Sequence, residues 1–218
     1  MGSFFTKVTC RLAAGKDTKY DYRFGGRPHH RGLVPPGRNK PVTLLYDLDL
    51  RDPKHGLSEF FPGLTRLPLL AALQYNGTGL LYRVTSDNTV ELQPLEDENT
   101  VWNKDFPFVD FPLYLPESPI CLKPLRILNR FRYSTPAIGE KVVLDQGFPE
   151  WRCPNSKKGC SLSCDSKRKQ VFATIWEMPL DTFHIWDKDL NSYLREEVII
   201  TFSRCTSCGI LHSAHQCS

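Results

Sequence analysis

The chain has 218 residues, of which 40% are hydrophobic and 24% charged, and its formal net charge is +4 at pH 7. This composition is that of an ordinary globular protein, and the length suits one large domain or two small ones. The sequence has no run of about 18 consecutive apolar residues, so we expect no membrane span.

The charges are unevenly distributed along the chain. Residues 1–40 carry nine Lys/Arg and two acidic residues, whereas residues 41–110 carry five Lys/Arg and eleven acidic residues. A basic segment can bind a phosphate backbone or an acidic partner. We favour the interpretation that it faces the acidic middle of its own chain, and no aromatic-rich basic motif of the RNA-binding type is present.

Seventeen prolines and fourteen glycines divide the chain into short pieces, which excludes long helices. Segments rich in strand-forming residues predict strands, and residues 86–88 predict the turn of a hairpin. The predicted strands are residues 42–50, 79–84, 89–92, 170–176 and 197–202.

Other segments have less regular patterns. Residues 67–73 and 181–195 are candidates for short helices, although Pro68 is allowed only near a first turn. Residues 106–119 contain four prolines and many aromatic residues. They predict an extended segment that buries side chains such as Tyr114 and Leu115.

Strand signals outnumber helix signals, so we expect a β-rich α+β fold. We divide it into a β-rich N-terminal half, residues 1–145, and a C-terminal zinc-binding half, residues 146–218. Phe24–Pro28 and Gln146–Trp151 are similar glycine- and proline-containing turns, and each precedes a loop and a strand. Two related half-domains would explain the similarity, and chance is the alternative.

Six of the eight cysteines lie beyond residue 150. The segment Cys205-Thr206-Ser207-Cys208-Gly209 has the C-x-x-C-G form of a zinc knuckle, in which two sulfurs bind one ion from a tight turn that the glycine permits. An antiparallel pair of strands at 170–176 and 197–202 would bring this turn near the earlier cysteines. The candidate ligands of a structural Zn²⁺ are Cys153, Cys160, Cys164, Cys205 and Cys208.

The fourth ligand stays open. We rank Cys164 above Cys160, because Cys164 directly precedes a predicted strand. His212 or His215 is an alternative fourth ligand. Eight cysteines, behind an N-terminus without the apolar core of a secretory signal, indicate a reducing, cytoplasmic location where clustered thiols bind metal more often than they form disulfides.

Other chemically versatile residues receive structural interpretations. His29 and His30 are expected on a solvated loop, and Asp47 and Asp49 on a solvated strand face rather than in a cation or acid–base site. The isolated Cys10 is expected to be a small buried hydrophobe, as is Cys121. The sequence contains no Walker loop, dinucleotide-binding glycine motif, nucleophile elbow or H-E-x-x-H motif.

The chain resembles the YwqG-like family of mostly bacterial proteins of undefined activity. The resemblance rests on Phe24–Pro28, on the strand Pro41–Leu50 and on Gly79–Tyr82. In the second half it rests on Gly147–Trp151 and on the segment from Phe202 through Cys205-x-x-Cys208-Gly209 to Gln216-Cys217-Ser218, which is similar to zinc-bearing members. A similar order of turn, strand and cysteines occurs in the eukaryotic programmed-cell-death family that chaperones a ribosomal protein. Tyr46 departs from the pattern, since the family usually has Gln there.

Together these features predict a zinc-stabilised protein-interaction module that acts as an adaptor, a chaperone or a toxin-neutralising partner. One alternative is a zinc- or thiol-dependent enzyme that uses the region Cys205–Cys217 with His212 or His215. Another is nucleic-acid binding through residues 7–40 and the run Lys167–Lys169. We favour a protein that is not an enzyme, with an unidentified protein partner.

Overall fold

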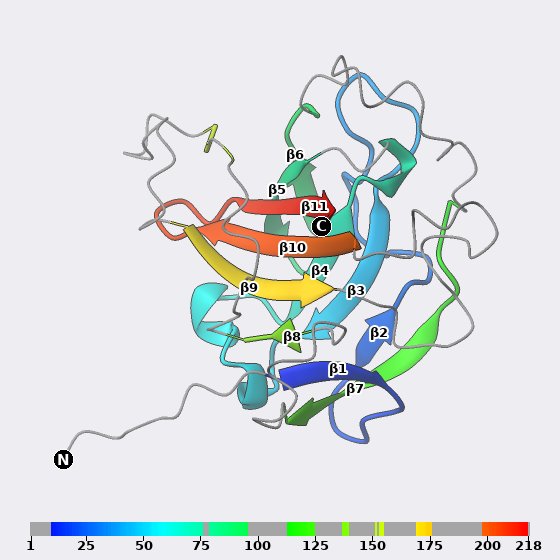
Figure 1. The fold of residues 1–218 in the computed structure, drawn as a ribbon, viewed down its shortest axis with the longest axis vertical. Coiled ribbons are helices and arrows are strands. Elements are labelled where there is room, and N and C mark those ends of the chain that lie inside the picture. Colours follow the sequence, from blue (N-terminus) through cyan, green and yellow to red (C-terminus); the bar gives the residue numbers. More distant parts are fainter. Residues whose placement is uncertain are drawn as a thin grey trace.

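The computed structural model describes residues 10–75, 79–95, 113–124, 137–139, 151, 153–154, 169–175 and 198–217. These residues form strands and three short 3-10 helices (Figure 1). In chain order the elements are β1 (Cys10–Ala14), β2 (Tyr22–Phe24), β3 (Thr43–Asp49), η1 (Pro53–His55), η2 (Ser58–Phe60), β4 (Arg66–Ala71), η3 (Leu73–Tyr75), β5 (Leu80–Ser86), β6 (Thr89–Leu92), β7 (Ser118–Pro124), β8 (Ala137–Ile138), β9 (Lys169–Ile175), β10 (Val198–Cys205) and β11 (Leu211–Cys217).

The described strands form one antiparallel sheet in the order β4-β3-β2-β7-β1-β8-β9-β10-β11-β5-β6. Figure 1 shows β9, β10 and β11 side by side, with β1 and β7 further along the same sheet. The sheet curls, because β4 at one end contacts β5 and β11 near the other end. The hydroxyl of Tyr82 in β5 donates a hydrogen bond to the Pro68 carbonyl and accepts one from the Leu70 N–H, both in β4.

The prediction of a β-rich fold is confirmed, and so are the predicted strand pairs. β5 and β6 form a hairpin in which Ser86 pairs with Thr89, so Asp87 and Asn88 make the turn. β9 and β10 pair antiparallel, with Cys205 opposite Lys169. Two separate half-domains are not confirmed, since β5 pairs with β11 across the proposed division and the sheet is continuous.

The predicted helix at residues 67–73 is wrong. Its first five residues lie in β4, and only Leu73 begins a 3-10 helix. A short apolar run does not distinguish a helix from a strand, and β4 is at an edge of the sheet, where the missing N–H of Pro68 interrupts no ladder. The helix expected at 181–195 lies outside the described residues.

The predicted burial within residues 106–119 is correct for Leu115 and wrong for Tyr114. Leu115 is buried, but the side chains of Leu113 and Tyr114 are exposed, Tyr114 by 39%. Residues 106–112 lie outside the described part of the chain. In that part, no helix has the length and apolar character needed to cross a membrane.

The apolar side chains form two clusters on opposite faces of the sheet region around β5. Leu80 and Tyr82 point into the main core, whereas Leu81 between them belongs to a smaller cluster. This division follows from the two-residue period of a strand. The smaller cluster consists of Leu81, Trp151, Cys153, Cys205 and Ile210, with Cys208 packed against it.

Candidate metal centre

Three of the predicted zinc ligands come together at this smaller cluster. The sulfur atoms of Cys153, Cys205 and Cys208 all lie within 4.8 Å of one another. Cys153 Sγ and Cys208 Sγ are 3.4 Å apart, although 55 positions separate them in the sequence. Cys153 and Cys205 are buried, with exposed fractions of 4% and 3%, and Cys208 is half-buried.

The turn between β10 and β11 positions two of the sulfurs. Cys205 ends β10, its N–H donates to the Ile210 carbonyl, and its carbonyl accepts from the Gly209 N–H. Gly209 has a φ of 72°, which is a left-handed conformation that residues with a Cβ rarely adopt. The glycine of the C-x-x-C-G motif therefore has the conformational role that the sequence predicts.

Side chains of β10 and β11 bind Trp151, which lies close in sequence to the third sulfur, that of Cys153. In the sheet register Ser203 of β10 lies opposite His212 of β11, and His212 lies opposite Leu81 of β5. Trp151 covers this row of residues: its indole N–H donates to Ser203 Oγ at 2.9 Å, and its ring stacks on that of His212 at 5.2 Å between centroids. Trp151 is two residues from Cys153, so these contacts fix the backbone that carries this cysteine.

The donor set and its spacing fit a tetrahedral thiolate site. Zn–S bonds of about 2.3 Å at tetrahedral angles place sulfurs roughly 3.8 Å apart. The sulfurs of Cys153, Cys205 and Cys208 lie within 4.8 Å of one another, so a small adjustment of side-chain rotamers would let all three bind one ion. Thiolates select Zn²⁺ and softer ions over Mg²⁺ or Ca²⁺.

The remaining candidate ligands have different outcomes. Cys160 and Cys164 lie outside the described residues, so their ranking stays a prediction. His212 lies in β11 and is buried. Among the described residues, the group of converging ligand atoms contains the three cysteines and no histidine. His215 also lies in β11, but its side chain is outside the described set.

A second polar cluster surrounds Asp47 in β3, and it overturns the expectation of a solvated strand face. Asp47 and Asp49 are completely buried. The Asp47 carboxylate accepts hydrogen bonds from Arg23 at 2.9 Å and from Arg66 at 3.1 Å, and His29 Nε2 lies 3.2 Å from it. The Arg23–Asp47 pair also shows that a basic residue of the N-terminal segment faces the acidic middle of the chain.

The two neighbouring histidines differ in their surroundings. The side chain of His29 is 42% exposed, in line with the expected loop position. His30 is buried, which corrects that expectation, and burial lowers its pKa. The rings of His29 and His30 stack on each other, and the ring nitrogens of His30 have no hydrogen-bond partner among the described residues.

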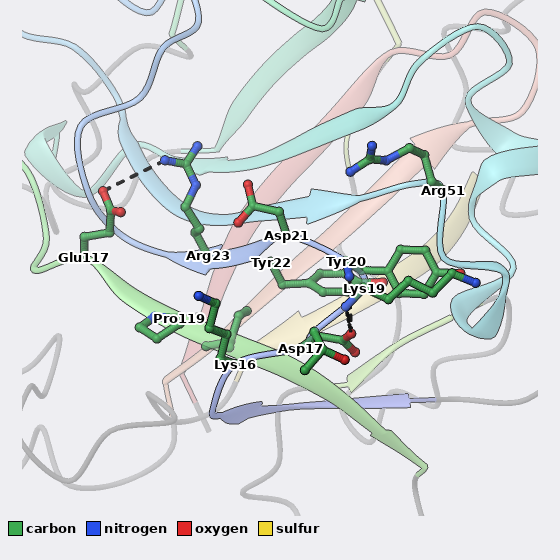
Figure 2. A pocket seen from close by; sticks show the side chains of 12 residues that line it. Lys16, Asp17, Lys19, Tyr20, Asp21, Tyr22, Arg23, Arg51, Glu117 and Pro119 are labelled. Atoms are coloured by element: carbon green, nitrogen blue, oxygen red, sulfur yellow. Dashed lines mark hydrogen bonds and ion pairs between the residues drawn. The ribbon is translucent and has the colours of Figure 1, made fainter.

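A polar cavity of about 340 Å³ lies next to the Asp47 cluster (Figure 2). Its walls come from the segment before and within β2, from Arg51 and from the beginning of β7. The lining residues are Lys16, Asp17, Thr18, Lys19, Tyr20, Asp21, Tyr22, Arg23, Arg51, Glu117, Pro119 and Ile120. Four cationic and three acidic side chains balance nearly to neutrality, so charge alone does not select an anionic or a cationic ligand.

The two isolated cysteines, Cys10 and Cys121, differ in how deeply they are buried. Cys10 is buried, its thiol donates to the Lys54 carbonyl, and burial, together with the charge of Asp52, raises the pKa of this thiol to about 11. Cys121 is half-buried in β7. A thiol with a raised pKa is a poor nucleophile at neutral pH, as expected for a structural Cys10.

Sequence reasoning missed the supporting residues of both clusters. The sequence pattern placed Trp151 in a turn but gave no function to its side chain. It also gave no ion-pair partner for Arg23 or Arg66. Charged residues with opposite sign were visible in the sequence, but their pairing depends on the neighbour relations β2–β3 and β3–β4.

A comparison of the chain with known protein families, with curated proteins and with solved structures returns no match. The resemblance to the YwqG-like family therefore stays an expectation.

Proposed function

We propose that this chain is a zinc-stabilised protein-interaction module of a reducing compartment. The observation that carries the proposal is the convergence of the Cys153, Cys205 and Cys208 sulfurs from segments about fifty residues apart. A fourth thiolate, from Cys164 or Cys160, would close the site. A closed tetrahedral site binds Zn²⁺ for stability, because it leaves no position for a substrate.

The location of the sulfurs supports a structural role for the ion. They lie on the face of β5, β10 and β11 that is opposite the main core, where the apolar cluster is small. An ion that bridges Cys153 to the β10–β11 turn would hold the segment around Trp151 onto this face. The binding energy of such an ion, on the order of 10 kcal/mol, becomes folding energy when the unfolded chain has no site.

Elemental analysis of protein purified without added metal tests the zinc site. We expect close to one zinc per chain. The Cys208→Ser variant should lose the metal and melt at a lower temperature, whereas Cys121→Ser, at a half-buried cysteine in β7, should keep both properties. Unchanged zinc content and melting temperature in Cys208→Ser would contradict the proposal.

The interaction role is supported by exposed apolar side chains beside a constrained turn. Leu113 and Tyr114 are exposed, and they precede Leu115, whose carbonyl accepts a hydrogen bond from the Gly26 N–H. Exposed aromatic residues are enriched where proteins bind one another. We propose this segment as part of the partner-binding surface.

Cross-linking followed by affinity capture from native lysate tests this role. The reference protein should repeatedly capture the same protein, and a Leu113→Ser/Tyr114→Ser variant with full zinc content should lose it. A zinc-loaded reference protein that captures no partner, or a double variant that captures the same partner equally well, would contradict the interaction role.

A further inference from the structure

The three thiols of the cysteine cluster differ in how deeply their residues are buried. Cys208 is half-buried in the β10–β11 turn, whereas Cys153 and Cys205 are buried. A soluble oxidant therefore reaches the sulfur of Cys208 before it reaches the other two. Oxidation of thiols follows thiolate character and exposure, and a thiolate held by a metal ion is already deprotonated.

The sulfur of Cys208 lies close to a sulfur from a distant segment of the chain. Cys153 Sγ lies 3.4 Å from Cys208 Sγ, so the two sulfurs are in contact before any movement. Trp151 holds the segment that carries Cys153, through its hydrogen bond to Ser203 and its stacking on His212. Cys153 therefore stays beside Cys208 whether or not an ion is bound.

The backbone of the C-x-x-C turn is fixed by two hydrogen bonds. The Cys205 N–H donates to the Ile210 carbonyl, and the Cys205 carbonyl accepts from Gly209. These bonds fix the backbone of the turn that carries Cys205 and Cys208. A Cys153–Cys208 bond uses sulfurs on two separate segments and leaves the turn unchanged.

We propose that Cys153 and Cys208 form an oxidation site for hydroperoxides, at which disulfide formation releases the zinc ion. The inference rests on the proposed zinc site. The Cys208 thiolate attacks one peroxide oxygen, the O–O bond breaks, and a sulfenic acid forms. The other oxygen leaves with its substituent and takes a proton from solvent, as water from hydrogen peroxide or as an alcohol from an organic hydroperoxide. Cys153 Sγ then attacks Cys208 Sγ, the S–O bond breaks, and the oxygen leaves as water after protonation. For hydrogen peroxide, two thiols and one oxidant give one disulfide and two waters.

Release of the ion follows from the loss of two ligands. The disulfide sulfurs no longer bind zinc as thiolates, so Cys205 and the fourth ligand are left to hold it. The new covalent bond joins residues 55 positions apart and keeps the segment around Trp151 attached to the sheet. The oxidised, zinc-free protein should therefore melt at a higher temperature than the reduced, zinc-free protein.

The test is a titration of reduced, zinc-loaded protein with hydrogen peroxide. A chromogenic chelator measures the zinc released, and mass spectrometry of alkylated peptides maps the disulfide. We expect one zinc released for each disulfide and a link between Cys153 and Cys208. The Cys208→Ser variant should form no such link, and Cys121→Ser should behave as the reference protein does. The Cys205→Ser variant should still form the link.

Three outcomes overturn the inference: a disulfide between Cys205 and Cys208, a disulfide to another cysteine, or oxidation of Cys208 to a sulfinic acid without any disulfide. The outcomes also separate this inference from the proposed function. Protein that contains zinc but forms no Cys153–Cys208 link retains the zinc site and refutes the oxidation site. Protein that contains no zinc but forms the link refutes the zinc site and the release of zinc, and retains only the thiol pair.

Discussion

At the scale of single residues, the buried carboxylates of β3 depend on the charged groups around them. Asp47 lies between two guanidinium groups, of which Arg66 also binds the exposed Asp21 carboxylate at 2.9 Å. Burial of an ion pair costs desolvation energy, but removal of one partner leaves the other charge uncompensated. The cluster therefore makes the fold sensitive to a change at Asp47.

The Asp47→Asn substitution should lower the free energy of unfolding by about 3 kcal/mol, since both arginines lose their buried counter-charge. The matched control is Asp21→Asn, which removes another carboxylate that binds the same Arg66. The side chain of Asp21 is 65% exposed. Exposed ion pairs contribute little to stability, so the Asp21→Asn control should lower the free energy of unfolding by less than about 1 kcal/mol. Urea unfolding of the two variants measures the difference; equal effects would contradict the argument.

Asp49 should make stability depend on pH in the acid range. Burial alone would raise its pKa, but hydrogen bonds from the Arg51 side chain and from the backbone N–H groups of Asp21 and Arg51 lower the pKa to about 2. Because this folded-state pKa is below the ordinary value of 3.8, the stabilisation is present above about pH 4 and is lost as pH falls toward 2.

Melting temperatures measured between pH 5 and pH 2 test this expectation. The reference protein should lose stability steeply across the lower part of the range. An Asp49→Asn variant should be less stable at pH 5 and should show a shallower decrease. Parallel curves for the two proteins would show that Asp49 contributes nothing to the pH dependence.

At the scale of elements, the turn between β10 and β11 determines the geometry of the cysteine cluster. Gly209 has a φ of 72°, and a Cβ at this position would meet no heavy atom within 4 Å. The requirement for glycine is therefore conformational and not a matter of space. Gly63 has a φ of 82° and is equally open, which makes it a matched control away from the cysteines.

Both Gly209→Ala and Gly63→Ala should lower the free energy of unfolding by about 1 kcal/mol, because alanine is strained in the left-handed region. Only Gly209→Ala should also weaken zinc binding, since it distorts the turn that carries Cys205 and Cys208. A competition titration with a zinc chelator measures this affinity. A loss of affinity in Gly63→Ala of the same size would show that general destabilisation, and not the turn, is responsible.

At the scale of the whole molecule, the curled sheet is closed by contacts between its ends. Tyr82 of β5 is fully buried, and its hydroxyl bonds backbone groups of Pro68 and Leu70 in the edge strand β4. These groups would otherwise be an unpaired sheet edge. Tyr46 is equally buried, but its hydroxyl has no hydrogen-bond partner among the described residues.

The Tyr82→Phe substitution should lower the free energy of unfolding by about 1–3 kcal/mol, because it leaves buried backbone groups of Pro68 and Leu70 without a partner. The Tyr46→Phe substitution should change it little or raise it, since the hydroxyl it removes is buried without a bond. Thermal unfolding of the pair of variants gives the comparison. A Tyr82→Phe protein as stable as Tyr46→Phe would show that the sheet ends are held by other contacts.

The sequence by itself determined the local features of this protein. Strand-forming residues located β3, β5, β9 and β10, and the polar residues 86–88 located the turn of a hairpin. The C-x-x-C-G spacing identified the turn at Gly209 and two of the converging sulfurs. These features depend on interactions between residues close in the chain, which a single sequence displays directly.

Tertiary structure decided what covers each face and edge. Alternation placed Asp47 and Asp49 on one face of a strand, but only the pairing of β3 with β2 and β4 brought arginines over that face and buried it. The edge position of β4 made a strand of residues 66–71 despite Pro68. The register across β10, β11 and β5 aligned Ser203, His212 and Leu81 beneath Trp151. The two-residue period of a strand predicts which side chains share a face. The residues that bury that face are distant in the sequence, and the packing of the whole sheet selects them.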